Sequence, residues 1–330
     1  MDADAGANHR SPERSVAVSL ARFLLKRSES FPPAPERQVT NLEEIFHHPM
    51  FLDAGEAERE RIMLQSSQAS YDAEMDYPWD HFFGQDLRPL LAGKAALDLG
   101  SFNGGRSVAM AERHDLESLT GLDVDPLYIE TATRFAESRD VPVEFKIGTA
   151  ESLPFEDAMF DAILTYEVFE HVRDPERALA ECHRILKPGG RMFVVFPGYY
   201  HPTGHHLSLV TGVPFINCLF SGKTLVRAYC EILDERGSDA DWYKRGSRDL
   251  EPWERSNAIN GTTVAAFHKL VRNIDWDIYL RRRSPIGSVG RNASTRTAGP
   301  IVSRFFTPFV YLPWLREVFV HRITYILEKR

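Results

Sequence analysis

The sequence of 330 residues contains little cysteine and no long uninterrupted apolar run. Its cysteines, Cys182, Cys218 and Cys230, are odd in number and form no CxxC pair, which argues against the usual structural zinc motifs and indicates a reducing compartment. The first 15 residues lack the basic-then-apolar order of a signal peptide. The apolar stretch at 305–327 is broken by prolines and charged residues. We therefore expect a cytoplasmic protein without a transmembrane segment.

The sequence also has no excess of positive charge, and its formal net charge is −8. Nucleic-acid binders depend on cations that neutralise phosphates, so this balance argues against a nucleic-acid partner. The charge is nevertheless uneven, since residues 271–330 hold eleven Lys and Arg but four Asp and Glu. A basic C-terminal part on an acidic body suits an anionic substrate or a membrane surface, and a solvated face is the simpler alternative.

From residue 94 onward, short apolar runs alternate with amphipathic stretches, which is typical of parallel βαβ units with helices on both faces. The runs predict strands at 95–99, 119–124, 143–147, 160–165, 191–196, 276–282 and 320–327. The amphipathic stretches predict helices that end near residue 113 and that span 126–138, 175–186 and 262–272. The pattern therefore predicts one α/β domain.

The rest of the chain divides by composition. Residues 1–38, which end in a proline-rich segment, are expected to be a flexible leader, and residues 39–93 a helical cover. The main domain then spans 94–330. Two irregular insertions, 198–261 and 284–318, are too long for ordinary loops, so we interpret them as functional caps.

The strongest chemical signal is Asp98-Leu-Gly-Ser-Phe-Asn-Gly-Gly105, which follows a predicted strand and opens a helix. Gly100 permits a tight turn and a close approach of ligand to backbone. The segment Gly121-Leu-Asp-Val-Asp125 ends the next strand, where an acid can accept hydrogen bonds from both hydroxyls of a ribose. Together they predict a nucleoside-containing ligand. A tight turn followed by a capped helix is the structural alternative.

Six motifs in order resemble those of the class I S-adenosylmethionine (SAM)-dependent methyltransferases, in particular the small-molecule branch of ubiquinone-biosynthesis enzymes. The motifs lie at 98–105, 121–125, 148–155, 160–161, 167–172 and 186–190. This resemblance covers about 94–197. It implies a Rossmann-like α/β fold with a seven-stranded mixed sheet, strand seven antiparallel, and SAM as the cofactor.

The same resemblance implies where SAM binds. Asp98 and Gly100 would lie under its methionine part and Asp123 on its ribose, with Ala150 and Glu151 beside the adenine and Tyr166 near the sulfonium. The expected cofactor residues are Asp98, Gly100, Ser101, Phe102, Asn103, Asp123, Val124, Ala150, Glu151 and Tyr166. Two positions depart from the pattern: Phe102 replaces the usual middle glycine, and Thr149 replaces a common adenine-binding aspartate.

Methyl transfer to a hydroxyl needs an aligned nucleophile and a base. Glu167, Glu170 and His171 follow the fourth strand, and in a helix their spacing would place them on one face. We expect Glu170, His171 and His206 to be catalytic. A second interpretation, implied by resemblance to metal-dependent small-RNA 2′-O-methyltransferases, is that Glu167, Glu170, His171 and His205 hold Mg²⁺. A helix start with a packed histidine is the structural alternative.

The first insertion is rich in aromatic residues, which could line a pocket for a ring or an isoprenoid chain or form the core of the cap itself. The sequence therefore predicts a methyltransferase of secondary metabolism that acts on a hydrophobic or aromatic small molecule, with O-methylation favoured. The alternatives are C-methylation of an alkene, isoprenoid or ring, metal-dependent RNA 2′-O-methylation, and a non-catalytic SAM-binding protein. The oligomeric state stays open, with a homodimer as one alternative.

Overall fold

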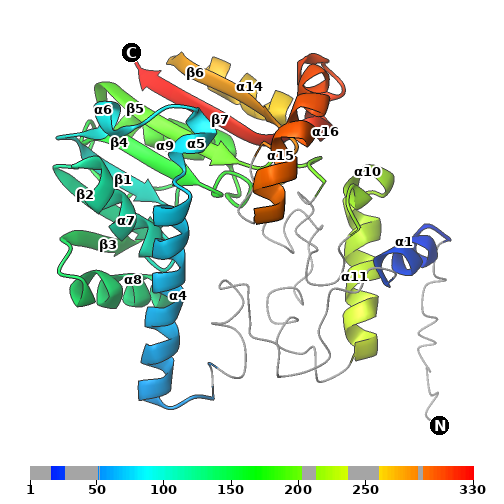
Figure 1. Cartoon of the computed structure of the whole chain (residues 1–330), viewed down its shortest axis with the longest axis horizontal. Coiled ribbons are helices and arrows are strands. Elements are labelled where there is room, and N and C mark those ends of the chain that lie inside the picture. The colour runs from blue at the N-terminus through cyan, green and yellow to red at the C-terminus, as the bar shows by residue number, and fades with distance from the viewer. Residues whose placement is uncertain (1–15, 27–50, 52, 203–212, 237–259, 289–292) are drawn as a thin grey trace, which may run out of the picture.

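The computed structural model describes residues 16–26, 51, 53–202, 213–236, 260–288 and 293–330. Within them, seven strands form one sheet in the order β3-β2-β1-β4-β5-β7-β6 (Figure 1). The strands are β1 (Ala95–Leu99), β2 (Ser118–Asp123), β3 (Val143–Ile147), β4 (Phe160–Tyr166), β5 (Leu186–Phe196), β6 (Trp276–Pro285) and β7 (Val320–Lys329). Strands β1 to β5 pair in parallel, and β7 is antiparallel to both β5 and β6. The predicted Rossmann-like α/β fold with an antiparallel seventh strand is confirmed.

Alternate residues of the central strands bury their side chains on opposite faces of this sheet. On one face, Ile163 and Val194 belong to a core cluster with α9 (Pro175–Ile185) and α14 (Val264–Asn273). On the other face, Leu164 and Val195 pack in a cluster with α5 (Asp80–Phe83), α6 (Arg88–Leu91) and α7 (Gly105–His114). Because both faces are covered, the central strands read as continuous apolar runs rather than as alternating ones.

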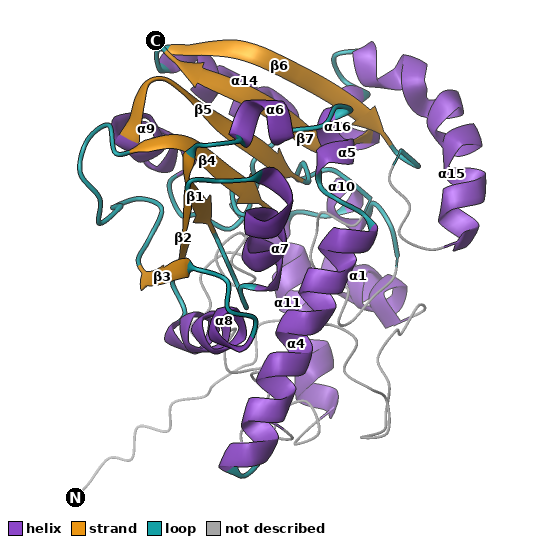
Figure 2. Ribbon diagram, turned by 60° about the vertical axis from the view of Figure 1, so that its left-hand side comes forward, coloured by secondary structure: helices purple, strands orange, loops and turns teal. Residues whose placement is uncertain are grey.

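The long helix α4 (Glu56–Asp76) lies across α7 and α8 (Pro126–Ser138) and occupies the region in which the sequence predicts a helical cover (Figure 2). It ends at Asp76, and the backbone amide of Tyr77 caps it by donating to the carbonyl oxygen of Ala73. Gly105 permits its close approach, since a Cβ at that position would overlap the backbone oxygen of Ser67. The helix is therefore seated directly on the start of α7, next to the glycine-rich turn.

A helix inside the predicted leader corrects one expectation. Helix α1 (Val16–Lys26) packs on α11 (Gly222–Arg236), and Ala21 and Leu25 are completely buried there. Residues 16–26 are therefore not a flexible leader. Their apolar stripe of buried Val18, Ala21 and Leu25 is short, and the partner helix lies about 200 residues away in the sequence, so the stripe gave no recognisable signal. The other leader residues lie outside the described part.

The second insertion is also more regular than the sequence predicts. It contains α15 (Ala293–Phe306), the 3-10 helix η2 (Thr307–Tyr311) and α16 (Arg316–Phe319). Pro300 stands inside α15, and a proline in a helix interior normally argues against a helix, which is why the sequence pattern predicts an irregular segment there. The first insertion contains α10 (Ile216–Leu219) and α11. In the described part of the chain, no helix has the length and apolar character needed to cross a membrane.

Candidate functional site

The glycine-rich turn follows β1 at the carboxyl edge of the sheet, where open α/β sheets bind ligands. Gly100 has a φ of 81°, and its amide donates to the carbonyl oxygen of Leu122 at 2.8 Å. The amide of Ser101 donates to the same oxygen at 3.1 Å. A Cβ at position 100 would overlap the side chain of Val168. Both the backbone conformation and the close packing therefore require glycine at this position.

Asp98 ends β1 beneath this turn and accepts a hydrogen bond of 2.6 Å from Ser107 Oγ. Burial raises the pKa of this carboxyl, so a cation bound beside it would be favoured. The hydroxyl of Ser101 is buried and has no hydrogen-bond partner among the described residues. A buried polar group without a partner is uncommon in proteins and is consistent with a ligand at the turn.

Asp123 ends β2 and holds the turn from the opposite side. Its carboxylate accepts hydrogen bonds from the amides of Phe102 at 2.9 Å and Asp125 at 3.2 Å. Phe102 stands in the place of the usual glycine and adopts a left-handed φ of 49°. Its ring packs edge-to-face on Tyr128 with 4.5 Å between centroids. These contacts stabilise a conformation that is otherwise unfavourable for a bulky residue.

Two of the expected cofactor residues are engaged with the protein itself. Asn103 is buried and donates to the hydroxyls of Ser66 at 2.8 Å and Ser70 at 3.0 Å, which ties the turn to α4. Glu151 accepts a hydrogen bond of 2.7 Å from the amide of Arg173 and so supports the turn after β4. Of the other expected residues, Ala150 is buried and Val124 is exposed. For all of these residues, contact with a cofactor stays a prediction.

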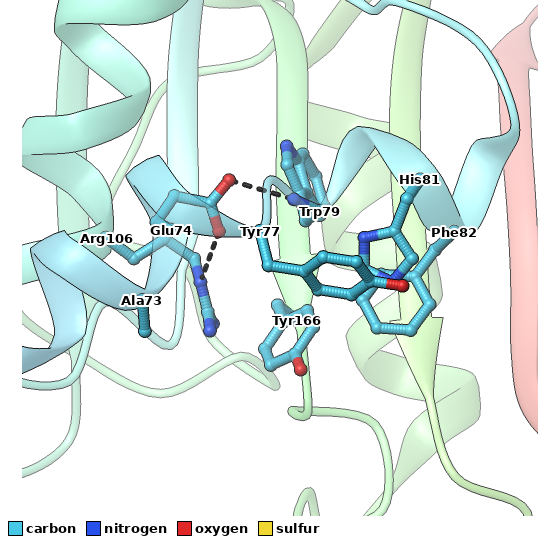
Figure 3. A pocket seen from close by; sticks show the side chains of 8 residues that line it. All are labelled: Ala73, Glu74, Tyr77, Trp79, His81, Phe82, Arg106 and Tyr166. Carbon is cyan, nitrogen blue, oxygen red and sulfur yellow. Dashed lines mark hydrogen bonds and ion pairs between the residues drawn. The ribbon is translucent and has the colours of Figure 1, made fainter. Parts of the chain in front are cut away.

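A half-buried cation lies against Tyr166, at the carboxyl end of β4. The guanidinium carbon of Arg106 is 3.6 Å from the centre of the Tyr166 ring, and Arg106 Nε is 3.2 Å from Glu74 Oε2 (Figure 3). Burial opposes the charge of Arg106, but Tyr166, Glu74 and Asp98 outweigh it and raise its pKa. Arg106 directly follows the glycine motif, yet the sequence analysis did not single it out because its two partners are distant in the chain.

The cover packs closely on this end of β4. Glu74 Oε1 accepts a hydrogen bond of 2.9 Å from the amide of Trp79, which joins α4 to the start of α5 (Figure 3). The space left between α4, α5 and β4 is about 10 Å³, roughly the room of one water molecule. It is lined by Ala73, Glu74, Tyr77, Trp79, His81, Phe82, Arg106 and Tyr166. This side of Tyr166 is therefore closed, and a substrate must approach it from another direction.

The segment after β4 is a turn, so the expected helical face of Glu167, Glu170 and His171 is wrong. Glu167 has a left-handed φ of 58°, and its amide donates to the carbonyl oxygen of Val195 at 2.8 Å. Its carboxylate pairs with the half-buried Arg322 of β7, with 2.7 Å from Oε1 to Nε. The charge that compensates Glu167 is therefore a guanidinium supplied by a distant strand.

Glu170 and His171 lie side by side on this turn. Glu170 Oε1 is 3.8 Å from His171 Nε2, and Glu170 is 5% exposed whereas the His171 side chain is 36% exposed. Asn260 holds the turn in place, because its backbone amide donates to the carbonyl oxygen of Glu170 at 2.8 Å. Its side chain donates to the carbonyl oxygens of Phe169 at 2.6 Å and Val172 at 2.7 Å. The sequence analysis missed this anchor, which lies about 90 residues away.

The predicted metal set gains no support from this geometry. Among the described residues, the carboxylates and imidazole that approach one another closely enough for a metal are Asp80, Asp86 and His114, at the other end of α7. Glu167, Glu170 and His171 form no such group, because the Glu167 carboxylate is paired with Arg322. His205 and His206 lie outside the described residues.

Two further histidines meet next to Arg322. The rings of His201, after β5, and His321, on β7, stack with 4.8 Å between centroids and 9° between planes. Burial, together with the charges of Arg322 and His81, lowers the pKa of His321 to about 3, so this imidazole is neutral near pH 7. Neither histidine stands in one of the sequence motifs, so their contact was not predictable.

Comparison with known proteins places this site in context. Residues 97–194 match the family model described as a methyltransferase domain. A ubiquinone biosynthesis O-methyltransferase of Pseudomonas paraeruginosa is 38% identical over 110 residues, which are 33% of this chain and 47% of that protein. A demethylmenaquinone methyltransferase of Thermus thermophilus is 36% identical over 145 residues, which are 42% of this chain and 64% of that protein. The chain thus spans about half of the length of the first of these relatives.

Among solved structures, a putative sarcosine dimethylglycine methyltransferase from Galdieria sulphuraria aligns with 81% of this chain and 88% of its own. The TM-score of that alignment is 0.45, and the sequence identity is 16%.

Proposed function

We propose that this chain, in which residues 97–194 form a class I methyltransferase domain, transfers the methyl group of SAM to a hydroxyl of a hydrophobic or aromatic small molecule. One observation carries the proposal. The exposed His171 imidazole, with the buried Glu170 carboxylate behind it, lies on the turn after β4, on the same sheet edge as the glycine-rich turn. A methyl donor bound at the glycine-rich turn and a base on the turn after β4 can therefore act on the same acceptor.

The residues at the turn fit SAM. The buried Asp98 carboxylate favours a cation and would face the ammonium of the methionine part, while the unpaired Ser101 hydroxyl is available for one more hydrogen bond. Asp123, at the end of β2, is the acid expected to bind the ribose hydroxyls. When bound, SAM supplies an activated methyl group, so the protein has to orient the acceptor and exclude water.

His171 is the better candidate for the proton acceptor, and Glu170 for the group that stabilises it. A base must reach the acceptor, and His171 is more exposed than Glu170. During transfer to a hydroxyl, His171 would take the proton of the acceptor oxygen, and the nearby Glu170 carboxylate would stabilise the imidazolium that forms. The sequence analysis treated both residues as catalytic candidates. Their difference in exposure supports His171 as the base and Glu170 as the group that stabilises its charged form.

The acceptor class rests on two observations. The first is that the two named relatives are a ubiquinone biosynthesis O-methyltransferase and a demethylmenaquinone methyltransferase. The second observation is Tyr166, a half-buried aromatic ring at the carboxyl end of β4. A hydrophobic or aromatic acceptor with a free hydroxyl fits these features best. The expected cytoplasmic location stays a prediction.

The experiment is a transfer assay with deuteriomethyl-labelled SAM and a panel of phenols, hydroxylated isoprenoids and sugars. Mass spectrometry detects the labelled methyl group in the product, and NMR identifies the atom that carries it. The proposal expects a labelled methyl ether from a phenol or another apolar alcohol. Transfer to a ring carbon alone, or to an RNA 2′-hydroxyl, would refute it.

A further inference from the structure

The insertion between β6 and β7 presents an apolar face to solvent. In α15, the apolar residues Ala298, Ile301, Val302 and Phe305 recur at the spacing that places them on one helical face, and all are exposed. Ile301 is 75% exposed and Phe305 is 67% exposed. Surface helices normally turn their apolar face toward the core, whereas α15 turns this face toward solvent.

The exposed apolar surface continues beyond α15 into the next segment. Tyr311, Leu312 and Trp314 are exposed, and Trp314 is 73% exposed. We call Ala298, Ile301, Val302, Phe305, Tyr311, Leu312 and Trp314 the α15 surface. A contiguous group of large exposed apolar side chains marks an interaction site rather than ordinary surface.

This surface is firmly anchored to the domain. Val310 is completely buried in the core cluster beneath the sheet. Phe306 and Phe309 pack on Phe319, with ring centroids 4.9 Å and 5.2 Å apart. The insertion therefore has its own inward-facing aromatic residues, and the α15 surface is what remains after that packing is complete.

The charge around the α15 surface has one sign. From residue 278 to residue 316 the chain has seven arginines and no lysine, aspartate or glutamate. Arg304 is exposed in α15 itself, and the Arg283 guanidinium lies 5.5 Å from the centre of the Tyr311 ring. The rest of the protein is acidic, since the whole chain carries −8. Of these seven arginines, Arg283 and Arg304 lie beside the exposed apolar side chains.

We infer that the α15 surface docks on an anionic lipid membrane. Exposed Trp, Tyr, Phe and Ile side chains with arginines among them match the composition of segments that lie in the membrane interface. There the apolar side chains enter the headgroup region, and the arginines pair with lipid phosphates. A protein partner could bury the apolar side chains, but an all-arginine segment without a single acid favours a uniformly negative surface.

The docking surface lies at the functional edge of the sheet. Pro285 at the end of β6 pairs with Val320 at the start of β7, so the insertion leaves the sheet at the end where Arg322 pairs with Glu167. Figure 2 shows α15 at the periphery, on the far side of the sheet from β3. Docking would hold this edge near the lipid, where an apolar acceptor accumulates. This consequence rests on the proposed function, whereas vesicle binding requires no catalysis.

The test is flotation of the full chain with unilamellar vesicles of phosphatidylcholine alone, or of phosphatidylcholine with phosphatidylglycerol. We expect binding to the anionic vesicles that weakens as salt is raised. Ile301→Ser combined with Trp314→Ala should reduce this binding at least tenfold. Phe23→Ser, which removes a 52% exposed apolar ring from α1, should leave it unchanged. Arg304→Gln should weaken binding to the anionic vesicles.

Fluorescence provides a second measurement. Trp79 and Trp276 are buried, while Trp314 is exposed. In a chain that also carries Trp242→Phe and Trp253→Phe, lipids brominated in their acyl chains should quench the emission when Trp314 is present and not when it is replaced in Trp314→Phe. Absence of binding to anionic vesicles, or quenching that persists in Trp314→Phe, would overturn the inference. So would a dimer in solution that the Ile301→Ser/Trp314→Ala variant abolishes, because a second copy would then cover this surface.

Discussion

Arg106 and Tyr166 form a stacked cation–π pair at the carboxyl end of β4, with 3.6 Å between the guanidinium carbon and the ring centre. One residue opens α7 directly after the glycine-rich turn, and the other ends the strand beside it. The pair therefore links the expected cofactor turn to the turn that carries Glu170 and His171. Its third member, Glu74, extends the link to the helical cover.

Arg106→Met should destabilise the protein by about 3–5 kcal/mol, because it leaves the buried Glu74 carboxylate without its cation. Adding Glu74→Gln should recover part of that loss, since the neutral amide can still accept the hydrogen bond from the amide of Trp79. Urea unfolding of both single variants and the double variant measures the coupling. A double variant whose destabilisation equals the sum of the two single effects would show that the charges are not coupled.

Acidification should destabilise the protein through His321. Its pKa in the folded state, about 3, lies below the ordinary value of 6.5 in the unfolded chain. The unfolded state therefore takes up a proton first, and stability is lost as the pH falls from about 6.5 toward 3. In His321→Asn this part of the acid sensitivity should disappear. Unfolding free energies measured at several pH values test the point, and an unchanged pH dependence in the variant would contradict it.

Asp98→Asn should raise the stability of the protein and weaken cofactor binding. Burial raises the pKa of this carboxyl, so its ionisation near neutral pH destabilises the folded protein, and the variant should unfold at a higher temperature. Its affinity for S-adenosylhomocysteine should fall about 10–100-fold, the typical cost of losing a hydrogen bond to a charged group. Calorimetry and thermal unfolding provide the two readings. A variant that binds as tightly as the wild type would exclude Asp98 from the cofactor site.

Leu25→Ala should cost about 2–5 kcal/mol, because Leu25 is completely buried between α1 and α11. Leu20→Ala is the matched control, since Leu20 is half exposed on the same helix. Hydrogen exchange should show faster opening of α11 in the first variant only. If neither substitution changes the protection of α11, the contact with α1 does not stabilise that helix.

The positions of the strands along the chain and of the glycine-rich turn were predictable, because both depend on local patterns. Apolar runs, Gly100 and the acid at position 123 signal their roles within a few residues of chain. The pairs Glu167–Arg322 and Glu74–Arg106 were not predictable, since each joins residues that are separate in the sequence and become neighbours only in the folded sheet. The turn at 167–171 was misread as a helix because i, i+3, i+4 spacing does not reveal the left-handed backbone of Glu167.

The second insertion is another region whose structure the sequence did not predict. The basic and apolar composition of the C-terminal part is visible in the sequence. The helix α15, which carries several of these residues, was not predictable because Pro300 lies inside it. Only the structure shows that Ile301 and Phe305 point outward while Val310 is buried. A pattern of apolar residues indicates a helical face, and tertiary packing decides whether that face is turned to the core or to solvent.

The measurement that bears most directly on the proposed function is single-turnover methyl transfer by the wild type, His171→Ala and Glu170→Gln. With an acceptor identified by the transfer assay, His171→Ala should slow transfer by roughly 10²–10⁴, the range of a lost general base, and leave the affinity for S-adenosylhomocysteine unchanged. Glu170→Gln should slow it less, because the imidazole remains. Full transfer activity in both variants, at unchanged cofactor affinity, would contradict the assignment of the reaction to this turn.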